Sequence, residues 1–468
     1  MKKCIIFGAG FYGKGAYYKL NKYFDIIYYV DNNISIQGSA VYGIPIISLE
    51  QLGNVYDKSI EVIICSRSYW EMANQLKERG INEYSVMVEG FLYHYSKEET
   101  MMPRELSTID YYKKDKSERS ILFVQNTACI RTHKIASMMK KRGYKVFLFY
   151  TIAPPEGNNE NFASVYDGIF TTFSATSFID FVNNSDFDIV HSSNELDCLT
   201  NYLHNTNKKI VFDVHDMMSL CGFDQVETLV LEHLANTKSD GIIYTSQGAL
   251  DIANTKFKLK YKKSFVLENL ILNQIKVQKN HKKLSSIDNE IHCVYEGGIE
   301  GKNKNYHRYF EEIWKKITDC GIHIHYYCPL DSNYCKELEK KSPYLHFEGN
   351  LGSQQLATEM TKYDCGLVLL NVNDGNRTLL ETASPNKVNE YLNSGLPVVV
   401  GDVQSLIRFV EKYKVGVHLD LDGDIKSQLV KVKKIVIPKD FLIKNKLTMD
   451  SYAEELDKFY TSVIQEDI

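Results

Sequence analysis

The stretch Ser384-Pro-Asn-Lys-Val-Asn-Glu-Tyr-Leu-Asn-Ser-Gly-Leu-Pro-Val-Val-Val400 predicts a short helix followed by a buried strand. Ser384 is a good N-cap residue, and Pro385 suits the first helical position. Gly395 suits the stop at the carboxyl end of the helix. The apolar run 397–400 then has the length and composition of a strand that is covered on both faces. A capped helix that leads into a buried strand is typical of a parallel α/β sheet.

The predicted helix has one apolar and one polar face. Val388, Tyr391 and Leu392 share the face expected to pack inward. Asn386, Lys387 and Glu390 are three or four residues apart and share the other face. The amides at the helix start and the Lys387 ammonium would attract an anion, and Glu390 lies within reach of sugar hydroxyls. The alternative is a surface helix with a Lys–Glu pair worth a few tenths of a kcal/mol.

Outward from this stretch, short apolar strands alternate with longer amphipathic segments, which predicts an α/β fold of three Rossmann-like units. The expected organisation is a Rossmann-like domain at 1–95, a linker at 96–119, a second unit at 120–272, a third at 290–438, and a terminal helical segment at 439–468 that packs back onto an earlier unit. In the third unit, strands are expected at 291–295, 322–327, 345–347, 365–370, 397–400 and 416–419.

A second motif, Gly8-Ala-Gly10-Phe-Tyr-Gly13, lies between the first predicted strand and the first helix. Glycines at this spacing allow a tight turn and the close approach of a diphosphate, and Asp31 ends the next strand, where it can bind ribose hydroxyls. We expect a nucleotide-type ligand at Gly8, Gly10, Gly13 and Asp31. The alternative is a tight turn that binds nothing. Hydride transfer is disfavoured because no catalytic constellation follows.

The run 384–400 resembles the donor-site helix of GT-B glycosyltransferases of the bacterial polysaccharide type (glycosyltransferase family 4/1-like), and weaker similarities extend over about 350 residues of the second and third units. The resemblance implies that the last two units form a two-domain GT-B enzyme, the second unit for the acceptor and the third for the donor. It implies that Glu390 binds the ribose of a nucleotide-diphosphate sugar, and that Lys387 and the amides near Asn386 bind its diphosphate.

Further donor residues follow from the same resemblance. The segment 294–298 looks like the first strand and glycine turn of a donor domain, with Gly297 and Gly298, and 345–349, ending in Gly349, looks like the segment lining the base. The usual basic pair after the first strand has three candidates here: Lys302, Lys304 and Arg308. Retaining members usually carry a glutamate eight positions before the second one, but Thr382 stands there, with Glu381 adjacent. This departure leaves the stereochemistry open.

The first 95 residues resemble the small N-terminal domain of bacterial sugar acyltransferases. The shared features are Gly8-Ala9-Gly10, Asp31-Asn32-Asn33 and Gly43-Ile44-Pro45. In that family the domain binds a nucleotide sugar. The hexapeptide repeats of the acyltransferase catalytic half are absent from this sequence, so acyl transfer is not implied.

Histidines at predicted strand ends are the candidates for acceptor chemistry. His215 stands between Asp213 and Asp216 at such an end, which faces the ligand crevice in an open α/β sheet. We expect His215 or Asp216 to orient or deprotonate the acceptor hydroxyl and Lys387 to stabilise the leaving group. The alternative for His215 is a structural hydrogen bond. His191, and Arg131 with His133, have weaker cases.

Composition excludes several classes. The 468 residues carry 55 Lys plus Arg against 59 Asp plus Glu, which gives no basic footprint for nucleic acid. The ten cysteines form no CxxC pair, so neither a zinc site nor any other metal site is expected, and free thiols fit a cytoplasmic protein. No stretch of 18 apolar residues exists. The lysine-rich run 256–263 is read as an exposed edge strand, with peripheral contact to anionic lipid as the alternative.

Together these features predict a glycosyltransferase that moves a sugar from a nucleotide-diphosphate sugar to a saccharide or lipid-linked saccharide in surface polysaccharide biosynthesis, with no required cofactor. A GT-B-shaped sugar-nucleotide epimerase and a degenerate nucleotide-sugar-binding module are the alternatives. Neither the donor base, the acceptor nor the oligomeric state follows from the sequence.

Overall fold

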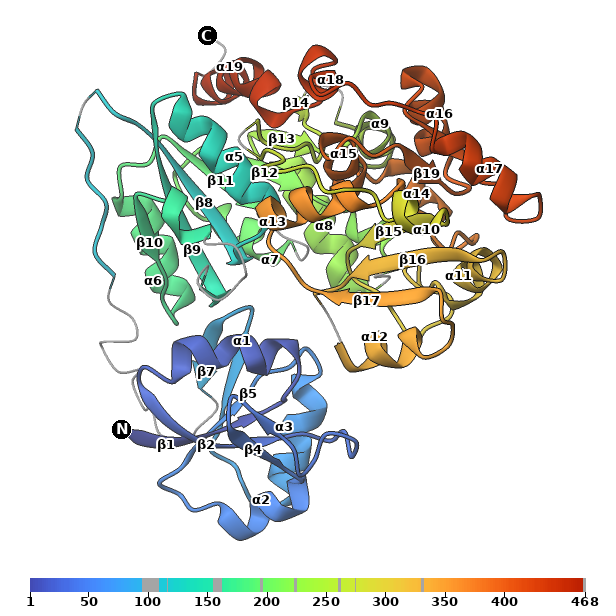
Figure 1. The fold of residues 1–468 in the computed structure, drawn as a ribbon. Helices are drawn as coiled ribbons and strands as arrows, with labels where there is room; N and C mark the ends of the chain where they lie inside the picture. Colours follow the sequence, from blue (N-terminus) through green and yellow to red (C-terminus); the bar gives the residue numbers. More distant parts are fainter. Residues whose placement is uncertain are drawn as a thin grey trace. The chain divides into compact units, whose positions relative to one another are not determined.

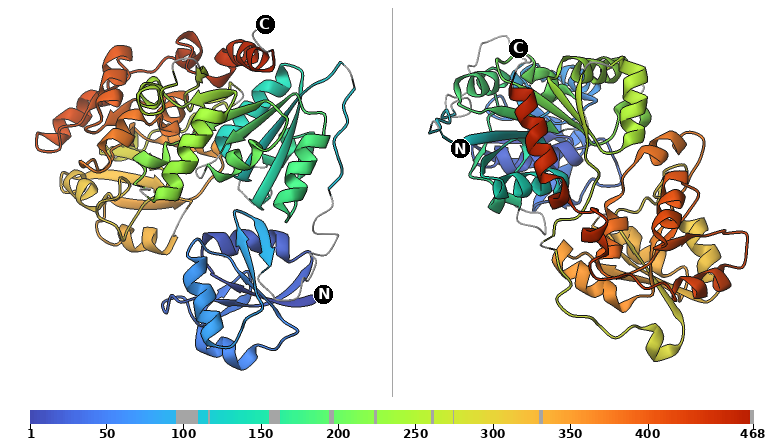
Figure 2. Two further views of the ribbon diagram at one scale, coloured as in Figure 1. Left: turned by 180° about the vertical axis from the view of Figure 1, so that it is seen from behind. Right: turned by 90° about the horizontal axis from the view of Figure 1, so that it is seen from above.

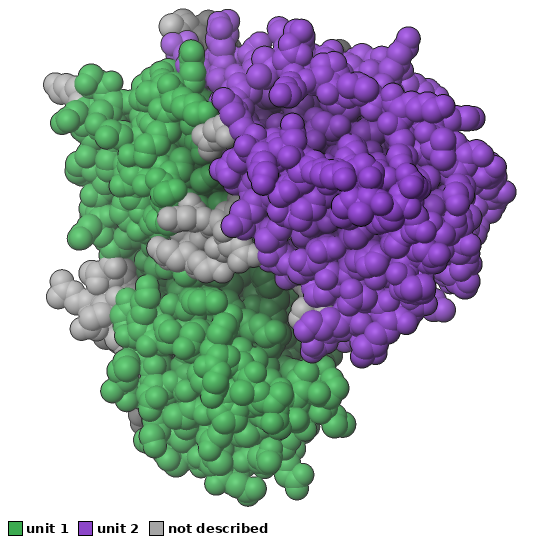
Figure 3. Space-filling model, in the orientation of Figure 1, with its two compact units in different colours: residues 1–212, 238–240 green, residues 213–237, 241–468 purple. Residues whose placement is uncertain are grey.

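The computed structural model describes residues 1–94, 109–115, 117–154, 162–193, 197–222, 225–259, 262–273, 275–329 and 332–465. Of the expected linker 96–119, most positions lie outside these ranges. The chain divides into two compact units: residues 1–212 with 238–240, and residues 213–237 with 241–468 (Figure 3). Three sheets run through them, coloured in sequence order in Figure 1.

The first sheet has the order β3-β4-β2-β1-β5-β6-β7. Its strands are β1 (Lys2–Phe7), β2 (Phe24–Val30), β3 (Ala40–Val41), β4 (Ile44–Ile47), β5 (Glu61–Ile64), β6 (Ser85–Val88) and β7 (Phe91–His94), and its helices are α1 (Phe11–Leu20), α2 (Leu49–Val55) and α3 (Tyr69–Glu78). The pairs β3–β4 and β6–β7 are antiparallel. One apolar core lies under α1, and another lies under α2 and α3, so the helices cover both faces. The strands β3, β4 and β7 were not predicted from the sequence pattern.

The second sheet has the order β10-β9-β8-β11-β12-β13-β14. Its strands are β8 (Arg119–Thr127), β9 (Tyr144–Ala153), β10 (Gly168–Phe170), β11 (Ile189–Ser193), β12 (Ile210–Val214), β13 (Gly241–Tyr244) and β14 (Lys263–Val266), and its helices are α5 (Ile130–Lys141), α6 (Ala175–Asn184), α7 (Cys198–Leu203), α8 (Val226–Lys238) and α9 (Gln247–Phe257). The chain runs from β8 outward to β10 and then starts the other half at β11. The point where this order reverses therefore lies between β8 and β11.

The third sheet is parallel throughout, with the order β17-β16-β15-β18-β19-β20. Its strands are β15 (Ile291–Glu296), β16 (Ile322–Tyr327), β17 (Leu345–Gly349), β18 (Cys365–Val368), β19 (Val398–Val400) and β20 (Gly416–His418). Its helices are α10 (Ser285–Asp288), α11 (Glu311–Thr318), α12 (Ser332–Glu339), α13 (Ser353–Glu359), α14 (Arg377–Thr382), α15 (Asn386–Asn393), α16 (Gln404–Tyr413) and α17 (Ile425–Val432). Here the order reverses between β15 and β18, and α15 packs on one face while α11 packs on the other.

The chain ends in α18 (Phe441–Lys444) and α19 (Ala453–Ile464), drawn in red in Figure 2. Helix α19 packs on β14: the Lys263 ammonium donates to the Ser462 carbonyl at 2.6 Å, and the rings of Phe265 and Phe459 stack at 5.6 Å. The lysine-rich run is not a strand at its start, since α9 continues to Phe257 and Lys256 forms an ion pair with Glu232 at 3.1 Å.

Within the described ranges, no helix is long and apolar enough to cross a membrane. All ten cysteines are free, and six of them are buried.

Candidate functional site

The third sheet places α15 and the end of β15 together at its carboxyl edge, beside the point where the strand order reverses. Ligands of open α/β sheets bind at this place. Helix α15 begins at Asn386 with Pro385 as its N-cap, one residue later than expected. Ser384 does not cap the helix, because its hydroxyl accepts a hydrogen bond from the Asn269 amide at 3.0 Å. The predicted inward residues Val388, Tyr391 and Leu392 are buried, and Gly395 follows the helix end.

Lys387 is the central cation of this site. Its ammonium lies 4.0 Å from the centre of the Tyr295 ring, a cation–π contact. Gly297 follows the same strand, and a β-carbon there would lie 3.3 Å from the ammonium. Burial, helped by the nearby Arg308 charge, lowers the pKa of Lys387 to about 7. The site therefore holds a cation that lacks full hydration and would gain from an anionic ligand.

Arg308 is the member of the basic trio that acts on Lys387. Lys302 and Lys304 are exposed on the preceding loop. The Asn371 side-chain amide donates to the carbonyls of Lys304 at 2.7 Å and Tyr306 at 3.2 Å, which ties this loop to the segment after β18. Arg308 is half-buried, and its charge affects both Lys387 and Tyr295.

His307 is a part of this site that the sequence did not single out. Burial lowers its pKa to about 4, with further lowering by the charges of Arg308 and Lys387. A neutral imidazole therefore lies beside these two basic groups at pH 7. Glu296, buried at the end of β15, and Glu390, one turn into α15, act in the opposite direction and raise the pKa of Lys387.

The remaining predicted donor residues lie around the same edge. The Gly298 carbonyl accepts from the Tyr295 hydroxyl at 2.8 Å, and the Gly349 carbonyl accepts from the Cys328 amide at 2.9 Å. Asn386 and Glu390 are half-buried on α15. The structure thus brings Gly297, Arg308 and Lys387 together, with Glu390 in electrostatic range.

Glu381, considered as a substitute for the missing first glutamate, has a different task. Its two carboxylate oxygens accept from the amides of Gln404 at 2.7 Å and Ser405 at 2.9 Å, at the start of α16. This is the position that a helix N-terminus favours for a carboxylate. Thr382 donates back to carbonyls of its own helix. The expected position of the first glutamate therefore carries no carboxylate.

The His215 Nε2 atom lies 3.6 Å from a carboxylate oxygen of the buried Asp213, whereas Asp216 is exposed. Thr245 donates to the His215 carbonyl at 3.1 Å, and the adjacent Ser246 donates to the Thr382 carbonyl at 2.7 Å. His215 is thereby connected, through two neighbouring residues, to the segment that precedes α15. The weaker candidates are internal: His191 is fully buried with its ring 4.9 Å from Phe123, and Arg131 is also buried.

The glycine turn of the first sheet is closed by Asp31. Its carboxylate oxygens accept from the amides of Ala9 at 2.7 Å and Asn33 at 2.8 Å. A β-carbon on Gly13 would lie 1.7 Å from the Gly8 carbonyl oxygen, so the turn needs glycine there whether or not a ligand binds. A hollow of about 260 Å³ lies against this turn, and Gly8, Gly10 and Asp31 line it.

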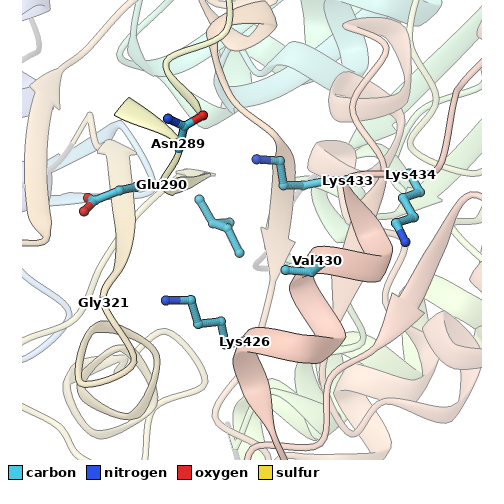
Figure 4. Close-up of a pocket in the computed structure, with 8 residues that line it drawn as sticks. Asn289, Glu290, Gly321, Lys426, Val430, Lys433 and Lys434 are labelled. Atoms are coloured by element: carbon cyan, nitrogen blue, oxygen red, sulfur yellow. The ribbon is translucent and has the colours of Figure 1, made fainter. Parts of the chain in front are cut away.

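A second hollow, of about 370 Å³, lies at the opposite edge of the third sheet. Figure 4 shows Lys426 and Lys433 reaching from α17 and its carboxyl end into the space beside Asn289 and Glu290. None of the predicted site residues lines it. It adjoins the amino ends of the strands, where ligands of such sheets are not usually bound.

A histidine cluster was also not predicted. His292 and His325 contact at 2.9 Å, and His323 and His346 at 2.7 Å, across β15, β16 and β17. The first of these pairs has a carboxylate on either side: Asp288 contacts His292 at 2.9 Å, and Glu348 contacts His325 at 2.7 Å. Among the described residues no group is arranged to hold a metal ion.

Parts of the chain match known protein families, and its fold is similar to solved structures. A family model described as "Glucosyltransferase 3-like, C-terminal domain" matches residues 307–438, and one described as "C2185-like, N-terminal" matches residues 1–87. No curated protein matches the chain. Anabaena HepE, solved with UDP and glucose, has a TM-score of 0.52 at 13% identity, covering 73% of this chain and 99% of that chain. A glycosyltransferase from Rickettsia africae has a TM-score of 0.51 at 10% identity, covering 75% and 100%.

The fold is of the GT-B type. The predicted α/β class, with three Rossmann-like units of which the last two form a GT-B pair, is confirmed. The family match at 307–438 contains Arg308, Lys387 and Glu390.

Proposed function

We propose that this chain transfers a glycosyl group from a nucleotide-diphosphate sugar to a hydroxyl of a saccharide or a lipid-linked saccharide. The observation that carries the proposal is the half-buried Lys387, its ammonium against the Tyr295 ring and beside Arg308, at the start of α15 and at the carboxyl edge of the third sheet. A diphosphate there would meet two cations and the helix amides. Because HepE was solved with UDP, uridine diphosphate is the first donor base to test.

In the proposed reaction, a new bond forms between the acceptor oxygen and the anomeric carbon of the sugar, and the bond from that carbon to the diphosphate breaks. The leaving diphosphate gains negative charge, which Lys387 and Arg308 stabilise. Glu390 binds the ribose hydroxyls. His215, held beside Asp213, takes the proton from the acceptor hydroxyl. The glycine turn of the first sheet, with its adjoining hollow, is proposed as a second nucleotide-type site.

Release of nucleoside diphosphate from a panel of nucleotide sugars tests this proposal, with p-nitrophenyl glycosides as acceptors. We expect release by the wild type and at least a tenfold loss in kcat/KM for Glu390→Gln, since about 1.4 kcal/mol of lost binding corresponds to that factor. Sugar conversion without any acceptor would instead indicate an epimerase. Binding without release under any donor would indicate a degenerate binding module and would contradict the proposal.

A further inference from the structure

The first sheet's helix α1 and strand β7 are anchored on the carboxyl edge of the second sheet, within the first compact unit. The Lys19 ammonium is buried and donates to three carbonyl oxygens: Gly90 at 3.0 Å, Thr151 at 2.7 Å and Thr172 at 3.0 Å. A β-carbon on Gly90 would lie 2.0 Å from the Thr151 oxygen, so the two backbones touch. In Figure 1, α1 and β7 lie on the side of their domain next to β8 and β9.

The hydrophobic cores of the two sheets also exchange residues. Phe91 of β7 belongs to the core that contains Val124 and Phe178 of the second sheet's layer. In return, Phe173, which follows β10, belongs to the core that contains Leu20 of α1. Exchange of fully buried aromatic residues is typical of a permanent junction rather than of a transient contact. The first domain is therefore a fixed part of this edge.

This junction lies at the place where the second sheet would bind its own ligand. Asn126 is at the carboxyl end of β8 and Thr151 is at that of β9. The strand order reverses between β8 and β11, and the crevice outside the carboxyl ends at such a point is where open α/β sheets bind ligands. In the proposed function this sheet serves the acceptor.

Glu89 brings a carboxylate from the first domain to this point. It is 7% exposed, and with Gly90 it forms the two-residue turn between β6 and β7, in which both residues have positive φ, +49° and +84°. Its carboxylate accepts from the Asn126 side-chain amide at 2.6 Å and from the Tyr12 hydroxyl at 3.5 Å. This tight turn places the Glu89 carboxylate against the carboxyl end of β8.

Asn126 is fixed from two sides. Its amide nitrogen donates to Glu89, and its oxygen accepts from the Thr151 hydroxyl at 3.2 Å. A carboxamide has two N–H donors and two acceptor lone pairs, so these contacts use one of each. A donor and an acceptor together match a sugar hydroxyl, which both donates and accepts. The Asn126 side chain is half-buried, so its second N–H and its second acceptor lone pair can be reached by a ligand.

We propose that Asn126 binds a hydroxyl of the acceptor saccharide, and that Glu89, from the first domain, is the residue that positions it. This inference rests on the proposed function, because it assigns the acceptor to the second sheet. It gives the appended first domain a direct part in acceptor recognition, and it identifies the ligand class as a neutral, hydroxyl-bearing sugar.

Binding of p-nitrophenyl glucoside, galactoside and N-acetylglucosaminide to the full chain tests the inference without turnover. We expect Asn126→Ala and Glu89→Met each to weaken binding of the accepted glycoside about tenfold, the effect of losing one hydrogen bond worth about 1.4 kcal/mol. Glu89→Gln retains an oxygen that can accept from Asn126 and should restore affinity. The double variant should be little weaker than either single variant, because the two residues act as one unit.

Tyr93→Phe is the matched control, since it removes the 2.6 Å contact between the Tyr93 and Tyr202 hydroxyls in the same junction. It should lower the melting temperature and leave glycoside affinity unchanged. The inference is overturned if Glu89→Met behaves like this control, or if the wild type binds none of the three glycosides. Affinity for nucleoside diphosphates, measured on the same samples, should be unchanged in every variant. If the wild type bound no nucleoside diphosphate, that result would instead contradict the donor-site proposal.

Discussion

At the residue scale, Lys387 should make donor binding depend on pH. Its pKa is lowered to about 7 in the ligand-free protein, mainly by burial, and a bound diphosphate would raise it again. The protein should therefore take up a proton on binding near pH 7. Affinity for a nucleoside diphosphate should then fall as pH rises from 6 to 9.

Titration calorimetry in buffers with different ionisation enthalpies measures this uptake. Lys387→Arg, whose side chain stays charged, should remove the pH dependence. An unchanged pH profile in Lys387→Arg would show that another group titrates.

Also at the residue scale, the three basic candidates after β15 should differ in how much they contribute to diphosphate affinity. Arg308 is half-buried and acts electrostatically on Lys387, whereas Lys302 and Lys304 are exposed. Arg308→Met should weaken diphosphate affinity about tenfold or more, as expected for loss of a charge-assisted contact of about 1.5–3 kcal/mol. Lys302→Met and Lys304→Met serve as matched controls with less than a threefold effect. Equal losses in all three would mean that a diffuse positive field attracts the donor.

At the element scale, Glu381 should stabilise α16 without contributing to donor binding. Its carboxylate accepts from two amides at the start of that helix. Glu381→Ala should lower the free energy of unfolding by about 1 kcal/mol, the usual effect of losing an N-terminal cap. Denaturant unfolding measures this change, and calorimetry should show unaltered nucleotide affinity. A loss of nucleotide affinity at unchanged stability would restore Glu381 as a substrate ligand.

The histidine cluster should make the third sheet sensitive to acid. Burial lowers the pKa of His292, and burial with the charges of His325 and His323 lowers that of His346 to about 4. An unfolded histidine titrates near pH 6.5. The folded state thus binds fewer protons, and stability should be lost as pH falls below about 6.5 towards 4. Thermal melts across this range should show a smaller decline for His346→Gln, and an identical decline would contradict the assignment.

The sequence predicted elements better than their contacts. The regular apolar runs of the third sheet gave β16 with its observed bounds, because fully buried parallel strands have a strong local signal. The edge strand β7 was not predicted, although it pairs with the adjacent β6 across a two-residue turn. Ser384 was predicted to cap α15, yet Asn269, 115 positions earlier, uses its hydroxyl. A capping residue read from local sequence says nothing about such a competitor.

At the scale of the whole molecule, the first two sheets should unfold together. Lys19 donates to one carbonyl of the first domain, that of Gly90, and to two of the second sheet's domain, those of Thr151 and Thr172. Lys19→Met removes the side chain that donates to all three and leaves these buried carbonyl oxygens without that donor, which should cost about 1–3 kcal/mol. Hydrogen exchange should show β7 and β9 losing protection to the same degree. Loss confined to the first sheet would mean that the junction is weak.

Composition and motifs predicted an appended nucleotide-binding-like domain but could not show what it touches. Glu89 and Gly90 carried no local signal, since neither periodicity nor a motif marks a residue that acts across two sheets. Likewise, Lys387 was predicted as a donor ligand, whereas its contact with Tyr295 and its lowered pKa depend on how β15 and α15 pack. Both contacts join segments that are distant in the chain, so no local pattern predicts them.

The central claim is that the start of α15 binds the diphosphate of a sugar donor. Calorimetric titration of UDP, GDP and ADP into the wild type, Lys387→Met and Glu390→Gln tests it most directly, with Glu381→Gln as the matched acidic control. We predict binding of at least one diphosphate by the wild type and the control, with at least tenfold weaker binding in both α15 variants. Equal affinity in the wild type and both α15 variants would contradict the claim.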